Sequence, residues 1–265
     1  MFSSKKFAES TRILLVLSLS ACAVAQQTPQ SVTMPSTGHS GLDQYRASRI
    51  AVYTDDYGQL ARYRDANTAL KAPAPGESRV VFFGDSITDI WNIAESFPGK
   101  PYINRGIGGQ TTSQMLVRFR QDVINPQPKV VVILAGTNDI AGNTGPISNE
   151  DIEANYSSLT ELARAHNIRV IFSSILPVHN YTPKGEEFFA QRSPERILAV
   201  NYWLKDYCVA NNLIYLDYFS AMVDDKGLLK RDLADDGLHP NKAGYAIMAP
   251  LAEKAIAKAL GESAR

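Results

Sequence analysis

Short apolar segments separated by helical patterns constrain the fold of this 265-residue chain more than any other feature. Five of them are strand candidates: 80–83, 102–104, 130–134, 170–174 and 213–216. Short runs rich in valine, isoleucine and phenylalanine are typical of strands that are buried on both faces. Strands that alternate with helices predict an α/β fold, in which a parallel sheet carries helices on both sides.

The first apolar segment runs directly into Gly84-Asp85-Ser86, and this junction carries the strongest chemical signal. Ser86 would stand at the carboxyl end of a strand, which is the edge where open α/β sheets bind ligands. It would also lie in the positive field of a helix N-terminus. A second interpretation is that Ser86 is an ordinary helix N-cap, with Asp89 completing a capping box.

Chemically useful groups also follow other strand candidates and precede the last helix. They lie in three segments: Gly106-Ile107-Gly108-Gly109, Gly136-Thr137-Asn138-Asp139 and Asp236-Gly237-Leu238-His239. Acyl transfer needs a nucleophile, a base, a group that orients the base, and donors for an oxyanion. These segments and the serine can supply all four. Each segment alone has a simpler explanation, such as a turn, a solvated loop histidine or an incomplete dinucleotide-binding fingerprint.

Two other classes of function compete with acyl transfer. Asp85, Asp89, Asn138, Asp139 and His239 could be imagined as metal ligands of a phosphoesterase, although such sites normally need several histidines and the chain has four in all. The second competing class is a non-catalytic glycan-binding module on the same fold. Our interpretation of the charged neighbours, which include Arg105, is that they cap helices or support the site.

Taken together, the motifs resemble those of the SGNH hydrolases, the GDSL esterase/lipase superfamily. The resemblance covers residues 78–262 and rests on Gly84-Asp85-Ser86, Gly109, Gly136-Thr137-Asn138-Asp139 and the pair Asp236 and His239. The most similar branch contains platelet-activating-factor acetylhydrolase-like and carbohydrate acetylesterase-like members. As a set, the motifs are specific for the fold and the reaction, but they say little about the substrate.

The resemblance implies a role for each matched residue. Ser86 would be the nucleophile, His239 the general base and Asp236 the group that orients it. The backbone N–H groups of Ser86 and Gly109 and the side-chain amide of Asn138 would form the oxyanion hole. The implied fold is a flavodoxin-like three-layer α/β/α sandwich with about five parallel strands, and no metal or cofactor is expected.

The substrate would be a small-molecule or glycan ester with a short acyl group, and acetylated carbohydrates are the first expectation. A lysophospholipase or thioesterase of the same family is the alternative. The segment 177–192 leaves the active edge of the sheet, and we expect it to wall the substrate pocket together with Trp91. His179 and Tyr181, near the start of that segment, are the further pocket candidates.

Residues 1–25 have the pattern of an export signal, with basic residues before an apolar stretch too short to span a bilayer. Two processing routes are open: cleavage after Ala25, or lipidation of Cys22, which would tether the protein to a membrane. The protein is therefore expected to be exported from a bacterial cell, as a periplasmic, membrane-anchored or secreted protein. Residues 26–77 predict a flexible tether followed by a helical extension.

Composition adds two exclusions. The formal net charge is +0, which gives no electrostatic reason to expect a nucleic-acid partner. The chain has two cysteines, and if Cys22 is lipidated, Cys208 has no partner for an intrachain disulfide. Cys208 lies in an apolar helical pattern and is expected to be a small buried side chain.

Overall fold

A five-stranded parallel sheet forms the centre of the protein, in a computed structural model that describes residues 34–261. The predicted signal, including Cys22, lies outside the described residues. The strands are β1 (Val80–Gly84), β2 (Tyr102–Gly106), β3 (Val130–Leu134), β4 (Arg169–Ser173) and β5 (Ile214–Leu216). Their order is β2-β1-β3-β4-β5, and every neighbouring pair is parallel. The predicted α/β fold is confirmed, and each strand lies within two residues of its expected bounds.

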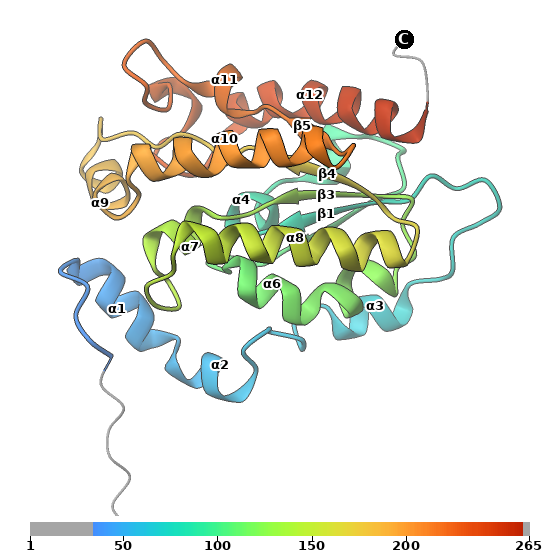
Figure 1. Ribbon diagram of the computed structural model, residues 1–265, viewed down its shortest axis with the longest axis horizontal. Coiled ribbons are helices and arrows are strands. Elements are labelled where there is room, and N and C mark those ends of the chain that lie inside the picture. The colour runs from blue at the N-terminus through green and yellow to red at the C-terminus, as the bar shows by residue number, and fades with distance from the viewer. Residues whose placement is uncertain (1–33, 262–265) are drawn as a thin grey trace, which may run out of the picture. The chain divides into compact units, whose positions relative to one another are not determined.

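Helices and short helical turns connect the strands (Figure 1). Before the sheet come α1 (Ser40–Ser48), α2 (Ile50–Asp55) and α3 (Arg64–Ala69). Within the sheet region lie α4 (Ser86–Asp89), α5 (Ile93–Ser96), α6 (Thr112–Phe119), α7 (Thr137–Ala141), α8 (Asn149–Ala165), α9 (Pro183–Gln191) and α10 (Pro194–Ala210). After β5 come α11 (Phe219–Met222) and α12 (Lys242–Leu260). A π-helical turn (Arg120–Ile124) extends α6, and a 3-10 turn (Arg231–Leu233) precedes α12.

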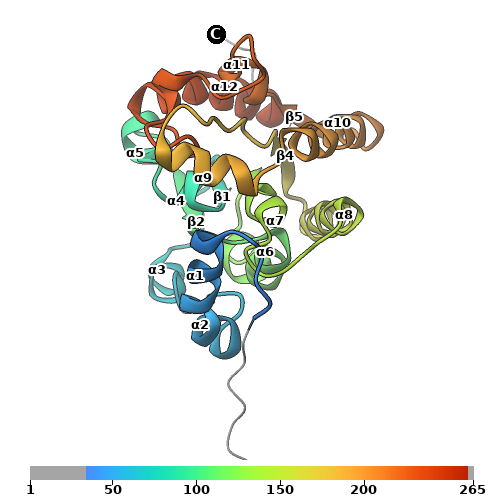
Figure 2. The ribbon, with the colours of Figure 1, turned by 90° about the vertical axis from the view of Figure 1, so that its left-hand side faces the viewer.

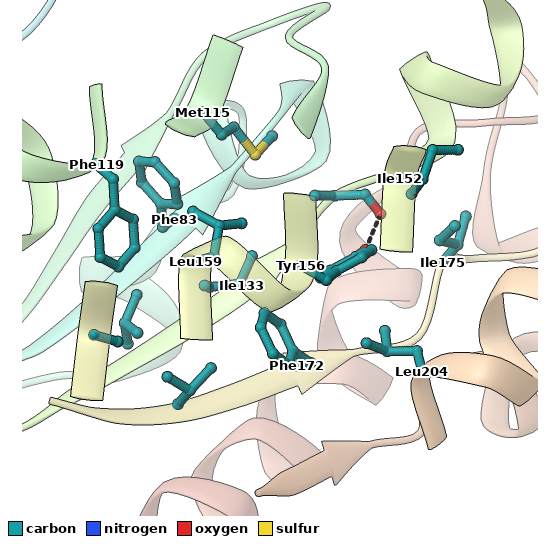
Figure 3. Close-up of a cluster of buried hydrophobic side chains, with 14 of the residues drawn as sticks. Phe83, Met115, Phe119, Ile133, Ile152, Tyr156, Leu159, Phe172, Ile175 and Leu204 are labelled. Carbon is teal, nitrogen blue, oxygen red and sulfur yellow. Dashed lines mark hydrogen bonds between the residues drawn. The ribbon is translucent and has the colours of Figure 1, made fainter. Parts of the chain in front are cut away.

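The alternate side chains of the strands point to opposite faces of the sheet, and each face has its own core. On one face, Val81, Phe83 and Ile133 pack with side chains of α6, α8 and α10, as Figure 3 shows. There the hydroxyl of Tyr156 donates to the carbonyl of Ala135 (2.9 Å), which satisfies a buried polar pair. On the other face, strand side chains pack against α12 and the aromatic cluster around α5. Figures 1 and 2 show the resulting three layers.

Local sequence signals set most helix starts. Ser148 and Asp151 form a capping box at the start of α8, and Ser193 caps α10 with Pro194 at its first position. Pro250 lies inside α12, and the helix continues through it. None of the helices in residues 34–261 combines the length and the hydropathy needed to cross a bilayer. Cys208 is buried in the core and free, and burial raises the pKa of its thiol to about 12.

The strand order places a switch point between β1 and β3, since the chain goes from β1 to β2 on one side and from β3 to β4 on the other. Loops that leave adjacent strands in opposite directions open a crevice at the carboxyl edge. Gly84 ends β1 in register with Gly106 of β2 and Leu134 of β3. The three segments that follow these strands therefore start side by side.

The segment before the sheet is bound along its length to the β2 and α6 region. The hydroxyl of Tyr63 donates to the Gly106 carbonyl (2.5 Å) at the end of β2. The side chain of Gln110 donates to the carbonyl of Gly58 (3.0 Å). On the far side, Arg105 donates to Asn67 of α3 (2.9 Å). Residues 57–67 are thus fixed against the loop that follows β2.

Candidate active site

Ser86 begins α4 directly after β1, and its hydroxyl is not used as a helix cap. Asp85 is the N-cap instead, and its carboxylate accepts the N–H of Ile87 (2.9 Å). The alternative capping role for Ser86 is therefore wrong, because the residue before it already satisfies the helix start. The Ser86 Oγ lies 2.9 Å from the Nε2 of His239.

His239 is held on its other side by Asp236. The carboxylate Oδ2 of Asp236 lies 2.6 Å from the imidazole Nδ1, and its Oδ1 accepts the backbone N–H groups of Leu238 (3.0 Å) and His239 (2.8 Å). Burial alone would raise the pKa of Asp236, but these hydrogen bonds outweigh burial and hold the pKa well below its usual range. An ionised Asp236 favours the tautomer with a proton on Nδ1, which leaves Nε2 free to accept from Ser86.

The loop that carries this pair is fixed by a glycine. Gly237 has φ +86°, and a Cβ on it would lie 2.6 Å from the carbonyl of His179 and from the Cα of Gly185. The N–H of His179 donates to the Gly237 carbonyl (3.0 Å). A side chain at position 237 would therefore push the Asp236–His239 turn away from Ser86.

Gly109 and Asn138 lie at the same edge. Gly109 has φ +77°, and within the described residues neither its N–H nor that of Ser86 has a protein acceptor. The buried Asn138 amide donates through Nδ2 to the carbonyl of Gln110 (3.1 Å). Its Oδ1 accepts from Arg192 Nη2 (3.2 Å), so the amide has a fixed orientation and one Nδ2–H left over.

Arg192, at the end of α9, is a site residue that sequence reasoning missed. Its guanidinium is buried and also donates through Nε to the Thr137 hydroxyl (3.1 Å). Burial lowers the pKa of this guanidinium to about 10, while the nearby carboxylates of Asp85 and Asp236 oppose that shift. The only sequence signal is that Arg192 ends the segment we expected to wall the pocket.

Two buried carboxylates support the site. Asp139 accepts the N–H and the hydroxyl of Thr112 (3.0 Å and 2.6 Å), which joins the loops after β2 and β3. Asp85 has one oxygen with no hydrogen-bond partner among residues 34–261. Burial raises the pKa of each carboxyl to about 6. Asp89 accepts the N–H of Gly108 (3.0 Å). These contacts agree with the supporting roles expected for the three aspartates.

A pocket of about 310 Å³ opens above Ser86. Its floor contains the four groups already described: Ser86, Gly109, Asn138 and His239. Its walls come mainly from two helices, α1 and α9, and the residues that line it are Gly41, Leu42, Tyr45, Asn143, Lys184, Glu187, Phe188, Gln191, Arg192 and Leu238. The Phe188 ring meets the His239 ring edge-on at 5.8 Å. Segment 177–192 therefore does wall the pocket.

The predicted pocket residues Trp91, His179 and Tyr181 do not line this pocket, so that prediction is wrong. Trp91 is buried in the aromatic core, where its ring stacks on Tyr245 (5.0 Å). His179 is fully buried, with Nε2 3.0 Å from the carbonyl of Ala234, and so supports the loop before His239. The Tyr181 hydroxyl donates to Asp224 (2.6 Å) on the outer side of the segment. Chain direction placed them at the correct edge, but their side chains pack elsewhere.

Residues 34–261 contain no group of three or more histidine, cysteine, aspartate or glutamate side chains arranged to hold a metal ion. The aspartates named as ligands in the phosphoesterase alternative are instead engaged with backbone N–H groups and Thr112.

The profile of the GDSL-like lipase/acylhydrolase family matches residues 82–247, which include Ser86, Asn138 and His239. This chain belongs to that family. Its members are carboxylic ester hydrolases, and the predicted family is confirmed.

Similar solved structures support the fold. A GDSL-like lipase from Bacteroides thetaiotaomicron is 40% identical, with a TM-score of 0.71, and the match covers 77% of this chain and 100% of that one. A catalytic mutant of an acetylxylan esterase from Geobacillus stearothermophilus is 21% identical, with a TM-score of 0.55 and coverage of 73% and 97%. At that identity the second likeness shows the fold alone.

A similar protein from Bacillus subtilis (strain 168) is the uncharacterized lipoprotein YqeF. It is 34% identical over an alignment of 136 residues, and the match covers 44% of this chain. The match spans 56% of the length of YqeF.

Proposed function

We propose that this family member is an exported serine esterase that removes short acyl groups, acetyl above all, from carbohydrate esters. The observation that carries the proposal is the continuous chain Ser86–His239–Asp236, with 2.9 Å and 2.6 Å contacts, at the floor of the pocket. Nucleophile, base and orienting group within hydrogen-bond distance are the arrangement that acyl transfer requires.

In the proposed reaction, the Oγ of Ser86 attacks the ester carbonyl carbon while His239 Nε2 takes its proton. The carbonyl oxygen becomes an oxyanion, which the N–H groups of Ser86 and Gly109 and the Asn138 amide stabilise. Collapse breaks the bond to the alcohol, and His239 returns the proton to that oxygen. Water activated by His239 then attacks the acyl group on Ser86 and releases the acid. Asp236 keeps the imidazole in the required tautomer throughout.

The size and chemistry of the pocket support a short acyl group on a polar alcohol. A volume of about 310 Å³ is at the small end of ligand pockets. Apolar side chains such as Leu42 and Phe188 lie beside amides and charges such as Asn143, Lys184 and Glu187. Apolar surface suits the acyl group, and the polar groups suit sugar hydroxyls.

Hydrolysis of p-nitrophenyl esters from acetate to palmitate, with Ser86→Ala in parallel, tests the proposal. We expect activity on acetate and butyrate that falls steeply with longer chains and is absent in the variant. Labelling by a serine-directed fluorophosphonate, lost in Ser86→Ala, would identify the nucleophile independently. Equal activity in Ser86→Ala would refute the mechanism, and a preference for palmitate would refute the short acyl group.

The second part of the proposal is that the protein is exported, either as a lipoprotein with a lipidated Cys22 or after cleavage behind Ala25. The lipobox-like position of Cys22 and the likeness to a lipoprotein favour lipidation. Expression of the full chain and of Cys22→Ala in a bacterial host, with radiolabelled palmitate, distinguishes the two routes. Label and membrane association that disappear in the variant support lipidation, whereas a soluble exported protein in both cases supports cleavage after Ala25.

A further inference from the structure

We propose that helix α1, which precedes the region matched by the family profile, forms one wall of the substrate pocket and that Tyr45 on it limits the length of the acyl group. The inference rests on the proposed esterase function. It assigns a specificity-determining role to a segment that the family motifs do not reach, since the family match begins at residue 82.

One face of α1 is turned toward the floor of the pocket. Gly41, Leu42 and Tyr45 line the same pocket as Ser86 and His239. The spacing of three and four residues puts these side chains on one side of the helix. Leu42 is only 4% exposed, so this side of α1 is covered by the body of the protein.

Tyr45 stands directly over a proposed oxyanion donor. A Cβ built on Gly109 would lie 1.8 Å from the Tyr45 hydroxyl oxygen, so this hydroxyl fills the space that a side chain at position 109 would take. Tyr45 and Gly109 also line the same pocket, so Tyr45 borders the place where the ester carbonyl would bind the Gly109 N–H. A rigid aromatic side chain at this place limits how large the neighbouring group can be.

Helix α9 closes the pocket from the other side. A Cβ on Gly41 would lie 1.8 Å from the carboxylate of Glu187, so the start of α1 touches α9. Figure 2 shows the two helices next to each other above the carboxyl edge of the sheet. Phe188 of α9 faces the pocket opposite the α1 residues. The space left for an acyl group is thus bounded by Tyr45 and Leu42 on one side and by Phe188 on the other.

The position of α1 is set by bonds of the residues that follow it, which makes the wall a fixed part of the fold. At the start of the helix, Asp43 accepts the N–H of Thr37 (2.8 Å), which fixes the local turn only. Behind it, Arg49 donates to Gln59 (2.7 Å), and residues 57–67 are bound to the loop after β2. A fixed wall imposes a size limit on the substrate, whereas a loose segment would move aside.

The test compares kcat/KM for p-nitrophenyl acetate and octanoate in wild type, Tyr45→Ala and Tyr45→Phe. We expect the octanoate-to-acetate ratio to rise at least ~10-fold in Tyr45→Ala, since steric limits in apolar pockets discriminate by about 10-fold or more per methylene. Tyr45→Phe removes the hydroxyl over Gly109 and keeps the ring, so the ratio should rise less than it does in Tyr45→Ala. Tyr202→Ala, a tyrosine 67% exposed on α10, is the matched control and should leave the ratio unchanged.

An unchanged ratio in a folded Tyr45→Ala variant would overturn the inference, as would a ratio that rises equally in Tyr45→Phe. If Tyr45→Ala does not fold, Leu42→Ala opens the same wall and is judged by the same ratio. Fluorophosphonate labelling of Ser86 separates this outcome from a failure of the proposed function. Normal labelling and acetate hydrolysis with an unchanged ratio reject only the role of α1, whereas absent labelling in wild type rejects the esterase mechanism and the wall together.

Discussion

Replacing Asn138 by alanine removes the proposed oxyanion donor that comes from a side chain. Loss of one such donor typically lowers kcat by ~10²–10³, which is about 2.7–4 kcal/mol of transition-state stabilisation. The structure supports a full effect, because the amide is buried and its orientation is fixed at both ends. Nδ2 donates to the Gln110 carbonyl at 3.1 Å, and Oδ1 accepts from Arg192 at 3.2 Å.

The same substitution has a calculable cost in stability. It leaves the Gln110 carbonyl and one N–H of Arg192 without these partners in a buried site, and each such loss costs about 1–3 kcal/mol. A total of at least about 2 kcal/mol lowers Tm by roughly 4–8 °C in a domain of this size. We therefore expect Asn138→Ala to be folded at 25 °C and impaired mainly in kcat.

The assay is p-nitrophenyl acetate hydrolysis at 25 °C, with thermal unfolding followed by circular dichroism and active sites counted by fluorophosphonate labelling. Asn138→Asp is the matched control, because it keeps the shape and the acceptor for Arg192 but has no N–H to donate. Asn138→Ala should lose kcat by ~10²–10³, and Asn138→Asp should lose at least as much, because its carboxylate also repels the oxyanion. A wild-type kcat in Asn138→Ala, or full activity in Asn138→Asp, would refute the assignment of the amide as a donor.

Three further predictions follow from the geometry. Asp236→Asn should lower kcat on p-nitrophenyl acetate less than His239→Ala does, because the carboxylate orients the imidazole while the imidazole itself carries the proton. Arg192→Lys, which cannot keep both bonds of the guanidinium, should lower kcat about 10-fold or more with little change in KM, since the oxyanion amide loses its fixed orientation. Burial raises the pKa of Asp85 from 3.8 to about 6 in the folded protein. The protonated carboxyl therefore stabilises the fold fully below pH 3.8, and this contribution is lost as the pH rises to about 6. Urea unfolding between pH 4 and pH 7 should show this decline, and Asp85→Asn, which can still cap α4 through its side-chain oxygen, should reduce it.

Each of these predictions has a result that contradicts it. A kcat in Asp236→Asn as low as in His239→Ala would mean that the carboxylate does more than orient the ring. A change confined to KM in Arg192→Lys would place that residue in substrate binding instead. An undiminished pH slope in Asp85→Asn would show that another buried group is responsible.

The sheet could be predicted from the sequence because its strands are buried on both faces. Segment 130–134 is apolar at every position, and β3 has those bounds. In a chain whose helical segments are amphipathic, a short run that is apolar at every position is typical of a strand buried on both faces. Ser86, Gly109 and Asn138 could be placed at one edge by the same logic, since the carboxyl ends of parallel strands meet there. His239 follows no strand directly, so this logic does not place it.

The identity of the helix cap could not be read from the motif. Asp85 and Ser86 are both good N-cap residues, and both have an acidic or polar residue three positions later. The choice depends on the residue at which the chain leaves β1, and the neighbouring strands set that point. Moving the cap by one residue decides whether the Ser86 hydroxyl bonds its own helix or faces His239.

The sequence by itself determined the fold class, the family and the groups available for chemistry, because these follow from local apolar patterns and short motifs. Only the tertiary structure decided what surrounds those groups. Tyr45 lies 41 residues before Ser86 and Arg192 lies 106 after it, yet α1 and α9 bring both to the pocket, while Trp91, five residues from Ser86, is buried in the core. Side-chain packing between distant segments depends on many weak contacts at once, and no short stretch of sequence encodes them.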